Sequence, residues 1–301
     1  MNHNSSATLT RPRVISTGVL WGLLGVATFS FTVPVTRFAV EAGMSATFVG
    51  SARAVVAAVL AATALLLTRQ RVPPRRLWPR LAIVAAGVVV GFPLLTSYAL
   101  VTTEATHGAV VIALLPAATA AFAVLRGKER PGMRFWIAAG LGAIVTVGFA
   151  AVQGGGIGSL TGADLLLLGA VVAAGVGYAE GGLLAREIGA WQTISWALVL
   201  SAPVMLVLSL VSVQADPFVV GPTAWLAFAY LGVVSMFFGF FAWYRGLAIG
   251  PMATVSQVQL TQPVMTVAWS VILLGEALEW ATAVGAVAVV ACAALAVRSR
   301  R

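Results

Sequence analysis

The sequence predicts an all-α membrane protein with ten transmembrane helices, arranged as two inverted five-helix repeats. The chain of 301 residues is 60% hydrophobic and 9% charged, and its mean hydropathy is +1.00. Its apolar runs are continuous over about 20 residues, which is typical of membrane helices and unlike the alternating strands of a barrel. The chain also repeats at a shift of 147 residues, which carries Pro116 onto Pro263 and Glu129 onto Glu276.

Each half of the chain holds five apolar segments. Five crossings return the chain to the opposite side, so the second half must lie upside down relative to the first. Inverted repeats are a transporter architecture with a substrate site near the midplane. The expected spans, numbered one to ten in chain order, are 14–35, 45–68, 80–102, 107–125, 134–152, 163–185, 191–213, 222–244, 252–274 and 280–297.

These spans divide the chain into a first repeat at 14–152 and a second repeat at 163–297. The tail at 1–13 is polar and basic, like the start of a signal peptide. The apolar stretch after it has full span length and no obvious cleavage site, so we predict a retained helix. The glycine-rich linker at 153–162 suits two bundles that move relative to each other, and it equally suits a plain surface loop.

The net charge of +9 invites a nucleic-acid-binding interpretation, but the positions of the charges indicate membrane topology. Sixteen of the 18 Lys and Arg residues fall in segments that a cytoplasmic N-terminus places inside, and the exceptions are Arg37 and Arg53. This bias predicts a multi-pass protein of the cell membrane with both termini in the cytoplasm. The expected partners are bilayer lipids and a small-molecule substrate, with no nucleic acid.

Small residues recur at helix spacing, as at Gly87 and Gly91. Such pairs let helices approach closely in lipid, and they permit a homodimer without requiring one. Prolines also lie inside expected spans, and Pro116 and Pro263 are repeat-equivalent. We expect this pair to act as hinges for alternating access, with static kinks as the alternative.

Several short motifs are spread over residues 14–297. They are Leu20-Trp21-Gly22, Ser51-Ala52-Arg53, Tyr98-Ala99-Leu100, Leu115-Pro116, Gly127-Lys128-Glu129-Arg130, Trp243-Tyr244-Arg245-Gly246, Gln262-Pro263 and Leu274-Gly275-Glu276. Together they resemble the EamA family of the drug/metabolite transporter superfamily. The resemblance implies a ten-helix secondary carrier in the inner membrane. It also implies that spans 1, 3, 4, 6, 8 and 9 surround a central cavity, while spans 5 and 10 mainly pack.

The resemblance does not fix the substrate, because family members are similar to exporters of amino acids, other metabolites or drugs. The two halves have also diverged. Leu168-Gly169 stands where Trp21-Gly22 maps, and Arg53 maps to Leu200. We therefore expect an asymmetric site.

Glu180 lies in the sixth span, several residues before Arg186. Ionisable groups inside a membrane helix are costly and default to functional hypotheses. Burial disfavours the charged carboxylate, so Glu180 could exchange protons near neutral pH as a coupling site, or could balance a substrate ammonium. A salt bridge to Arg245 or Arg186 near the cytoplasmic mouth is an equally favoured alternative.

Arg53 lies in the outer half of the second span, where its permanent charge needs a partner. Glu41 or Glu104 could supply one. The resemblance places span 2 beside the cavity and not across it. We therefore favour a structural charge that anchors the helix end.

The ninth span opens with the stretch from Ser256 to Gln262 (SQVQLTQ), which holds three glutamines. The equivalent stretch of span 4, residues 109–115, is wholly apolar. This asymmetry predicts a polar wall from span 9 that could bind a zwitterion or polar metabolite through Gln257, Gln259 and Gln262. Interhelical hydrogen bonds without a ligand are the alternative.

Aromatic side chains on the cavity-lining spans could stack on an aromatic or cationic substrate. We favour Tyr98 and Tyr178 and include Trp21 among the candidate substrate-binding residues. For Trp243 and Tyr244, near the inner surface, we favour anchors at the membrane interface.

The sequence shows no metal-ligand cluster and no GxxxxGK[ST] nucleotide loop, so we expect no cofactor and no ATP hydrolysis. An intramembrane enzyme would need a nucleophile–base pair or metal centre, and a channel would need a selectivity ring. We therefore expect a secondary active transporter, with export the favoured direction, for a small metabolite, amino acid or drug. A facilitator or exchanger without proton coupling is the alternative.

Overall fold

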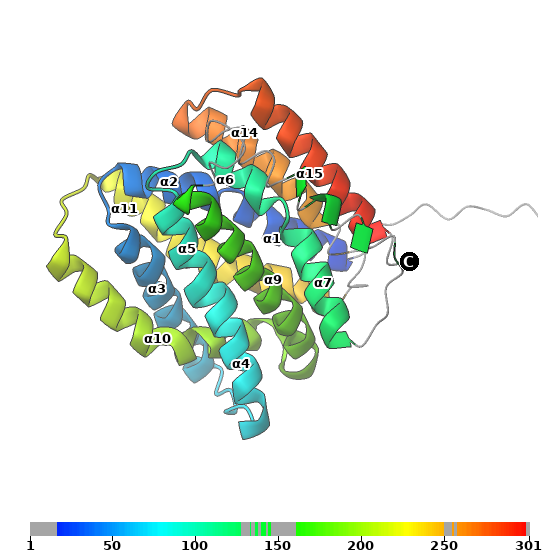
Figure 1. Ribbon diagram of the computed structural model, residues 1–301. Coiled ribbons are helices and arrows are strands. Elements are labelled where there is room, and N and C mark those ends of the chain that lie inside the picture. Colours follow the sequence, from blue (N-terminus) through cyan, green and yellow to red (C-terminus); the bar gives the residue numbers. More distant parts are fainter. Residues whose placement is uncertain are drawn as a thin grey trace, which may run out of the picture.

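The structure is a computed structural model, and it describes residues 17–127, 133, 136–137, 140–142, 144–145, 161–249, 255 and 258–298. This part of the chain is helical and contains no strand, as the sequence predicts. Figure 1 shows the helices packed into a bundle. The elements are α1 (Thr17–Ser30), α2 (Thr32–Glu41), α3 (Ala46–Leu67), η1 (Arg75–Leu77), α4 (Trp78–Val84), η2 (Ala85–Gly91), α5 (Phe92–Ala99), α6 (Ala105–Ile112), α7 (Leu115–Gly127), α9 (Gly162–Ile188), α10 (Ala190–Ala215), α11 (Pro222–Ala229), η3 (Tyr230–Gly239), α12 (Phe240–Ile249), η4 (Gln259–Thr261), α14 (Gln262–Leu274) and α15 (Trp280–Arg298).

Within the described residues, seven helical segments are long and apolar enough to cross a membrane. They are Thr17–Glu41, Ala46–Leu67, Arg75–Ala99, Ala105–Arg126, Gly162–Ile188, Ala190–Ala215 and Pro222–Ile249. These correspond to expected spans 1 to 4 and 6 to 8. Two shorter apolar helices fall within spans 9 and 10, while most of span 5, at 134–152, lies outside the described residues.

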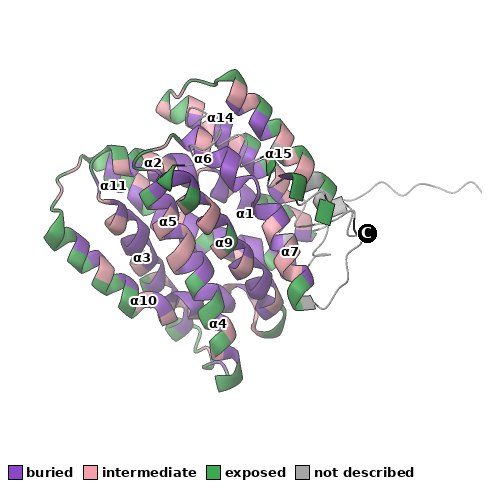
Figure 2. Cartoon of the chain, viewed as in Figure 1, coloured by how far each residue is buried: buried purple, intermediate pink, exposed green. Residues whose placement is uncertain are grey.

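The outward faces of the bundle are apolar. On α10, the exposed side chains include Val204, Leu206, Val207, Leu210 and Val211. Figure 2 shows exposed residues along this helix on the side away from α3, against which α10 packs. An aqueous surface would not carry such a continuous apolar face, whereas a lipid-facing one does.

The internal repeat is visible in the secondary structure. Helices α7 and α14 have 13 residues each, and the 147-residue shift carries the bounds of one onto the other. The same shift carries the π-helical segment η2 into the π-helical segment η3. π-helical turns widen a helix locally and are frequent at functional sites. The repeat therefore places matched irregularities in spans 3 and 8.

The first span is broken at Phe31, between α1 and α2. Pro34 lacks the backbone N–H that would bond to the Ser30 carbonyl oxygen in a continuous helix. The Thr266 hydroxyl from α14 donates to that oxygen instead, at 2.9 Å. The Tyr230 hydroxyl from η3 donates to the Thr28 oxygen at 2.7 Å. The second half of the chain thus satisfies the carbonyl groups that the break leaves free.

The repeated acid of the second half caps a helix of the first half. Glu276 accepts hydrogen bonds from the backbone N–H groups of Ala105 and Thr106, each at 2.7 Å. Glu104 occupies the N-cap position of α6, but its side chain accepts no hydrogen bond from a backbone N–H of that helix. A carboxylate at this end also interacts favourably with the helix dipole. Glu276 therefore ties the loop before α15 to the start of α6.

Replacing Glu276 by alanine is expected to lower the free energy of unfolding by about 1–2 kcal/mol, because two N–H groups at the start of α6 lose their acceptor. Denaturant titration of the purified protein in mild detergent measures the change. Glu279→Ala is the matched control, because Glu279 is exposed and its replacement removes the same charge three residues further along the chain. Equal losses in the two variants would contradict the capping role.

Candidate functional site

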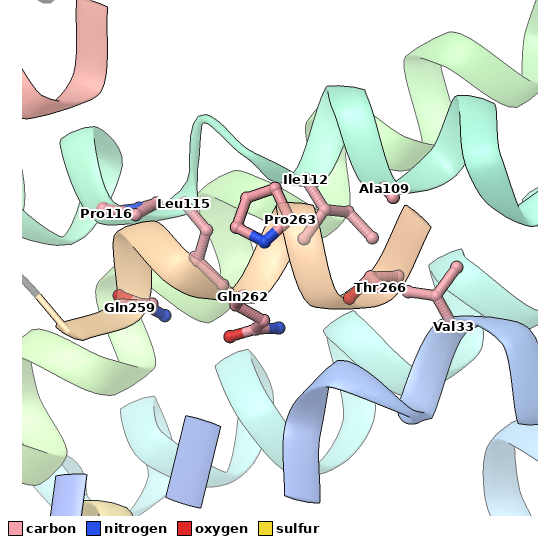
Figure 3. A pocket seen from close by; sticks show the side chains of 9 residues that line it. All are labelled: Val33, Ala109, Ile112, Leu115, Pro116, Gln259, Gln262, Pro263 and Thr266. Atoms are coloured by element: carbon pink, nitrogen blue, oxygen red, sulfur yellow. The ribbon is translucent and has the colours of Figure 1, made fainter. Parts of the chain in front are cut away.

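Two adjoining pockets lie where the halves of the chain meet. The first, which we call the glutamine pocket, has an empty volume of about 250 Å³. Its lining comes from α2, α6, α7, η4 and α14 (Figure 3). The residues are Val33, Ala109, Ile112, Leu115, Pro116, Gln259, Gln262, Pro263 and Thr266.

Three repeat-equivalent pairs line the glutamine pocket. They are Ile112 with Gln259, Leu115 with Gln262, and Pro116 with Pro263. In the first two pairs, an apolar side chain of the first half corresponds to a glutamine of the second. The pocket therefore has the asymmetric polar wall that the sequence predicts, although its use as a substrate site stays a prediction.

The two glutamines of this wall are buried with unused hydrogen-bonding atoms. Neither the oxygen nor the nitrogen of the Gln259 amide has a partner among the described residues, and the Gln262 oxygen also has none. A buried polar group without a partner is costly. Because these three atoms form no hydrogen bond between helices, they do not support the alternative role, in which the glutamines only join helices and bind no ligand.

The second pocket, which we call the central cavity, has an empty volume of about 380 Å³. It adjoins the first, since Gln262 and Val33 line both. Both π-helical segments contribute, and Val88 of η2 and Ser235 of η3 are repeat-equivalent. The lining residues are Phe29, Thr32, Val33, Arg53, Val88, Phe92, Pro93, Tyr178, Ser235, Met236, Phe240 and Gln262.

Three aromatic rings form one wall of the central cavity. Phe29 lies 6.2 Å from Tyr178 and 4.9 Å from Phe240, measured between ring centroids. Tyr178 and Phe240 are 5.9 Å apart. These rings come from α1, α9 and α12, so the wall joins the two halves and offers flat apolar surfaces to a solute.

Arg53 brings a positive charge into the central cavity. Its side chain is 1% exposed, and its guanidinium reaches the hydroxyls of Thr36 and Thr96, each at 3.4 Å. Its Nε has no partner among the described residues. The expected partners are wrong, because Glu41 pairs with Arg37 at 2.6 Å and Glu104 accepts from Thr106.

A polar contact closes the cavity wall between the halves. The hydroxyls of Thr32 and Ser235 are 2.7 Å apart and both are buried. Thr32 begins α2, directly after the break at Phe31, and Ser235 lies in the π-helical segment η3. The irregular backbone of spans 1 and 8 is therefore held together at the point where the cavity lies.

Glu180 lies outside both pockets, in a cluster with two arginines. The Nε of Arg126 donates to one carboxylate oxygen at 2.7 Å, and the Nε of Arg80 donates to the other. Arg80 also pairs with Glu187. The expectation of a salt bridge is confirmed, but the expected partners, Arg245 and Arg186, are wrong. The true partners come from α4 and α7 of the first half.

The other predicted site residues fall in different places. Tyr178 lines the central cavity, and Gln259 and Gln262 line the glutamine pocket. Trp21 packs on Phe241, with ring centroids 5.5 Å apart, and lines neither pocket. Tyr98, near the end of α5, is 48% exposed and hydrogen-bonds to the Thr47 hydroxyl. Gln257 lies outside the described residues.

The repeat-equivalent prolines occupy helix starts. Pro116 is the second residue of α7, after the two-residue link from α6, and Pro263 is the second residue of α14, after the 3-10 turn η4. A proline in the first helical turn removes no intrahelical hydrogen bond. The expected mid-helix kinks are therefore breaks between helices, and a hinge role at them stays a prediction.

Trp243 and Tyr244 correct another expectation. Both are 0% exposed, and Tyr244 donates to the Gly177 oxygen at 3.1 Å. They pack in the bundle where the sequence predicts interface anchors. Arg53 likewise shows that span 2 lines the cavity together with the spans that the resemblance implies.

Sequence reasoning missed Phe29, Thr32, Ser235 and Phe240 as cavity residues. One available signal was the repeat itself, since Val88 and Pro93 map onto Ser235 and Phe240. Had the lining of one half been known, the shift would have predicted these two in the other.

Comparisons with known proteins support the repeat and the fold. The model of the EamA-like transporter family matches residues 16–150 and again 161–298. The chain is 45% identical over 281 residues to the uncharacterized transporter YdeK of Bacillus subtilis (strain 168). The alignment covers 93% of this chain and 97% of that protein. A solved structure titled "Crystal structure of protein" has a TM-score of 0.64 at 20% identity, covering 93% of this chain and 96% of that one.

Proposed function

The chain belongs to the EamA-like transporter family, and we propose on this premise that it is a secondary active transporter. It exports a small metabolite, amino acid or drug across the cytoplasmic membrane by alternating access. Ten spans in two inverted repeats, with both termini in the cytoplasm, carry this movement.

The observation that carries the proposal is a buried cavity between the two halves. Arg53 and Tyr178 are 1% and 4% exposed, so a solute reaches them only when helices separate. The cavity lies at matched π-helical segments, η2 and η3, and such irregular turns are frequent at functional sites. Alternating access is the movement that exposes such a cavity to one side at a time.

Glu180 remains our candidate for coupling, with a mechanism that its partners suggest. Both of its carboxylate oxygens accept from guanidinium groups. The two guanidinium groups stabilise the ionised carboxylate, so Glu180 does not readily take up a proton while the cluster is closed. Proton uptake at Glu180 therefore requires α9 to separate from α4 and α7, which ties protonation to the opening of that end of the bundle.

The same occupied carboxylate favours the alternative, a facilitator or exchanger without proton coupling. If the cluster never opens to a proton, Glu180 serves only to hold the three helices together. The two functions share the cavity and the movement, and they differ in whether a proton moves with the solute.

The test is flux in liposomes that contain the purified protein and an enclosed pH-sensitive dye. Pools of amino acids, organic acids and cationic drugs are offered outside, with protein-free liposomes as the control. We expect solute flux that saturates, and proton movement that depends on the solute. Flux without a proton signal supports the facilitator, whereas flux that does not saturate contradicts a carrier.

A further inference from the structure

We infer, building on the transporter function proposed above, that the solute is a small organic monoanion. It presents a carboxylate to Arg53 in the central cavity and an apolar body to the wall of Phe29, Tyr178 and Phe240. Three features of the cavity favour such a solute: the charge of its lining, its unused hydrogen-bonding atoms and its aromatic wall.

The guanidinium of Arg53 is buried, and no described residue gives it a negative partner. Arginine keeps its charge in proteins, and an isolated buried charge is costly. Its two hydroxyl contacts of 3.4 Å are longer than the usual range for hydrogen bonds, and its Nε has no partner among the described residues. The site therefore has unused capacity for a stronger acceptor.

The described acids lie elsewhere. No described Asp or Glu lines the central cavity or the glutamine pocket. The buried and ion-paired acids have other partners: Glu41 pairs with Arg37, Asp164 with His107, Glu180 and Glu187 with Arg80, and Glu276 with the start of α6. Among the described residues no acid is left to pair with Arg53, and a ligand can supply the negative charge that it lacks.

A carboxylate fits this site better than a phosphate or a cation. The guanidinium fork matches two coplanar oxygens. Among the described residues that line this cavity, Arg53 alone is charged, so one negative charge balances it and two would not. A cationic solute would meet Arg53 with no acid nearby, and like charges at close range in a buried site repel strongly.

The rest of the lining selects the body of the solute. The aromatic wall offers stacking surfaces, and Val88, Phe92 and Met236 add apolar ones. The free oxygen of Gln262 and the hydroxyls of Thr32 and Ser235 offer places for one further polar group. An arylacetate matches this lining, with a carboxylate for Arg53 and a ring for the aromatic wall, and it enters when the helices separate.

The test measures ligand-dependent thermal unfolding of the full chain in mild detergent. The probe is phenylacetate, compared with phenylacetamide, phenethylamine and phenyl phosphate, which keep the ring and change the charge. A ligand that binds the folded state raises Tm in a saturable way. We expect phenylacetate to do so, and its half-saturating concentration to be at least about tenfold lower than those of the other three.

Arg53→Gln is expected to weaken phenylacetate binding at least about tenfold, and Arg53→Lys to weaken it less, because lysine keeps the charge without the fork. Arg76→Gln is the matched control, since Arg76 is exposed and lines neither pocket. Without ligand, Arg53→Gln should melt no lower than the original chain, because it removes an uncompensated buried charge. A large drop in that Tm would instead show the structural role and overturn the inference.

Equal stabilisation by phenylacetate and phenylacetamide, or an unchanged response in Arg53→Gln, also overturns the inference. So does the absence of an effect from phenylacetate, acetate and indole-3-acetate alike. The two proposals fail separately. Saturable flux of a neutral or cationic solute, with no carboxylate binding, keeps the carrier and removes the anion. Arg53-dependent binding of phenylacetate, with no flux of it or of any pooled solute, keeps the site and removes the carrier.

Discussion

Replacing both Arg80 and Arg126 by glutamine is expected to lower the free energy of unfolding by about 3–5 kcal/mol, because a buried carboxylate is left without a positive partner. The side chain of Glu180 is 2% exposed, so it cannot turn to solvent. Arg126 is 52% exposed and Arg80 22%, so each can leave the cluster more easily than the acid can. The acid is therefore the member that depends on the cluster.

Because the acid alone depends on the cluster, the variants should differ in their free energy of unfolding in ways that the number of lost ion pairs does not predict. Glu180→Gln alone should cost about 1.5–3 kcal/mol, the value of hydrogen bonds to a charged group, because both arginines can relax toward water. Adding Glu180→Gln to the double variant should restore most of the lost stability, because no buried charge then remains. Glu187→Gln is the matched control, and its exposed pair should contribute less than about 1 kcal/mol.

Denaturant titrations of these variants in detergent measure each step, and the cycle isolates the coupling between Glu180 and its two arginines. If the triple variant were no more stable than the double variant, the buried charge would not be the cause. The same set bears on transport. A cluster that must open during the cycle predicts that Glu180→Gln changes the rate of flux, whereas a purely static cluster predicts unchanged flux at a lower Tm.

The sequence was sufficient for the helices and for the repeat. Hydropathy predicts a long apolar helix such as α3 because each turn of it faces lipid or other helices, and both environments select apolar side chains. The repeat shift is equally readable, because α7 and α14 keep the same proline at the same position of the same turn. These features depend on residues close together in the chain.

The site was less predictable because it depends on contacts between distant residues. Glu180 is 100 residues from Arg80 and 54 from Arg126, and Arg186 and Arg245 looked equally suitable from the sequence. The break at Phe31 depends on Thr266 and Tyr230 for its carbonyl groups, and span 6, its repeat counterpart, continues through α9 without a break. No local pattern states which distant side chain completes a hydrogen bond.

Replacing Gly87 by alanine is expected to lower the free energy of unfolding by about 1–3 kcal/mol, since overpacking a close contact forces the backbone to move. A Cβ at Gly87 would lie 3.0 Å from the Gly177 Cα and against the backbone oxygen of Ala173. Gly177 faces the same contact from α9, where a Cβ would lie 3.2 Å from the Val88 nitrogen. Backbone packs on backbone here, so no flexible side chain can give way.

The position of this contact extends the effect from stability to function. Val88, next to Gly87, lines the central cavity, and Tyr178, next to Gly177, lines it from the other side. Separating η2 from α9 should widen the cavity between them. We therefore expect Gly87→Ala to weaken phenylacetate binding as well as to lower Tm, because the aromatic wall would no longer meet the ligand at contact distance.

Gly162→Ala is the matched control, because it lies at the start of the same helix α9 and an added Cβ has nothing within 4 Å. Alanine has a higher helix propensity than glycine, so this variant should be neutral or more stable by up to about 1 kcal/mol. Thermal unfolding with and without phenylacetate compares the two. A Gly87→Ala protein that matched Gly162→Ala in both measurements would show that η2 and α9 can separate at no cost, and that their close packing does not set the width of the cavity.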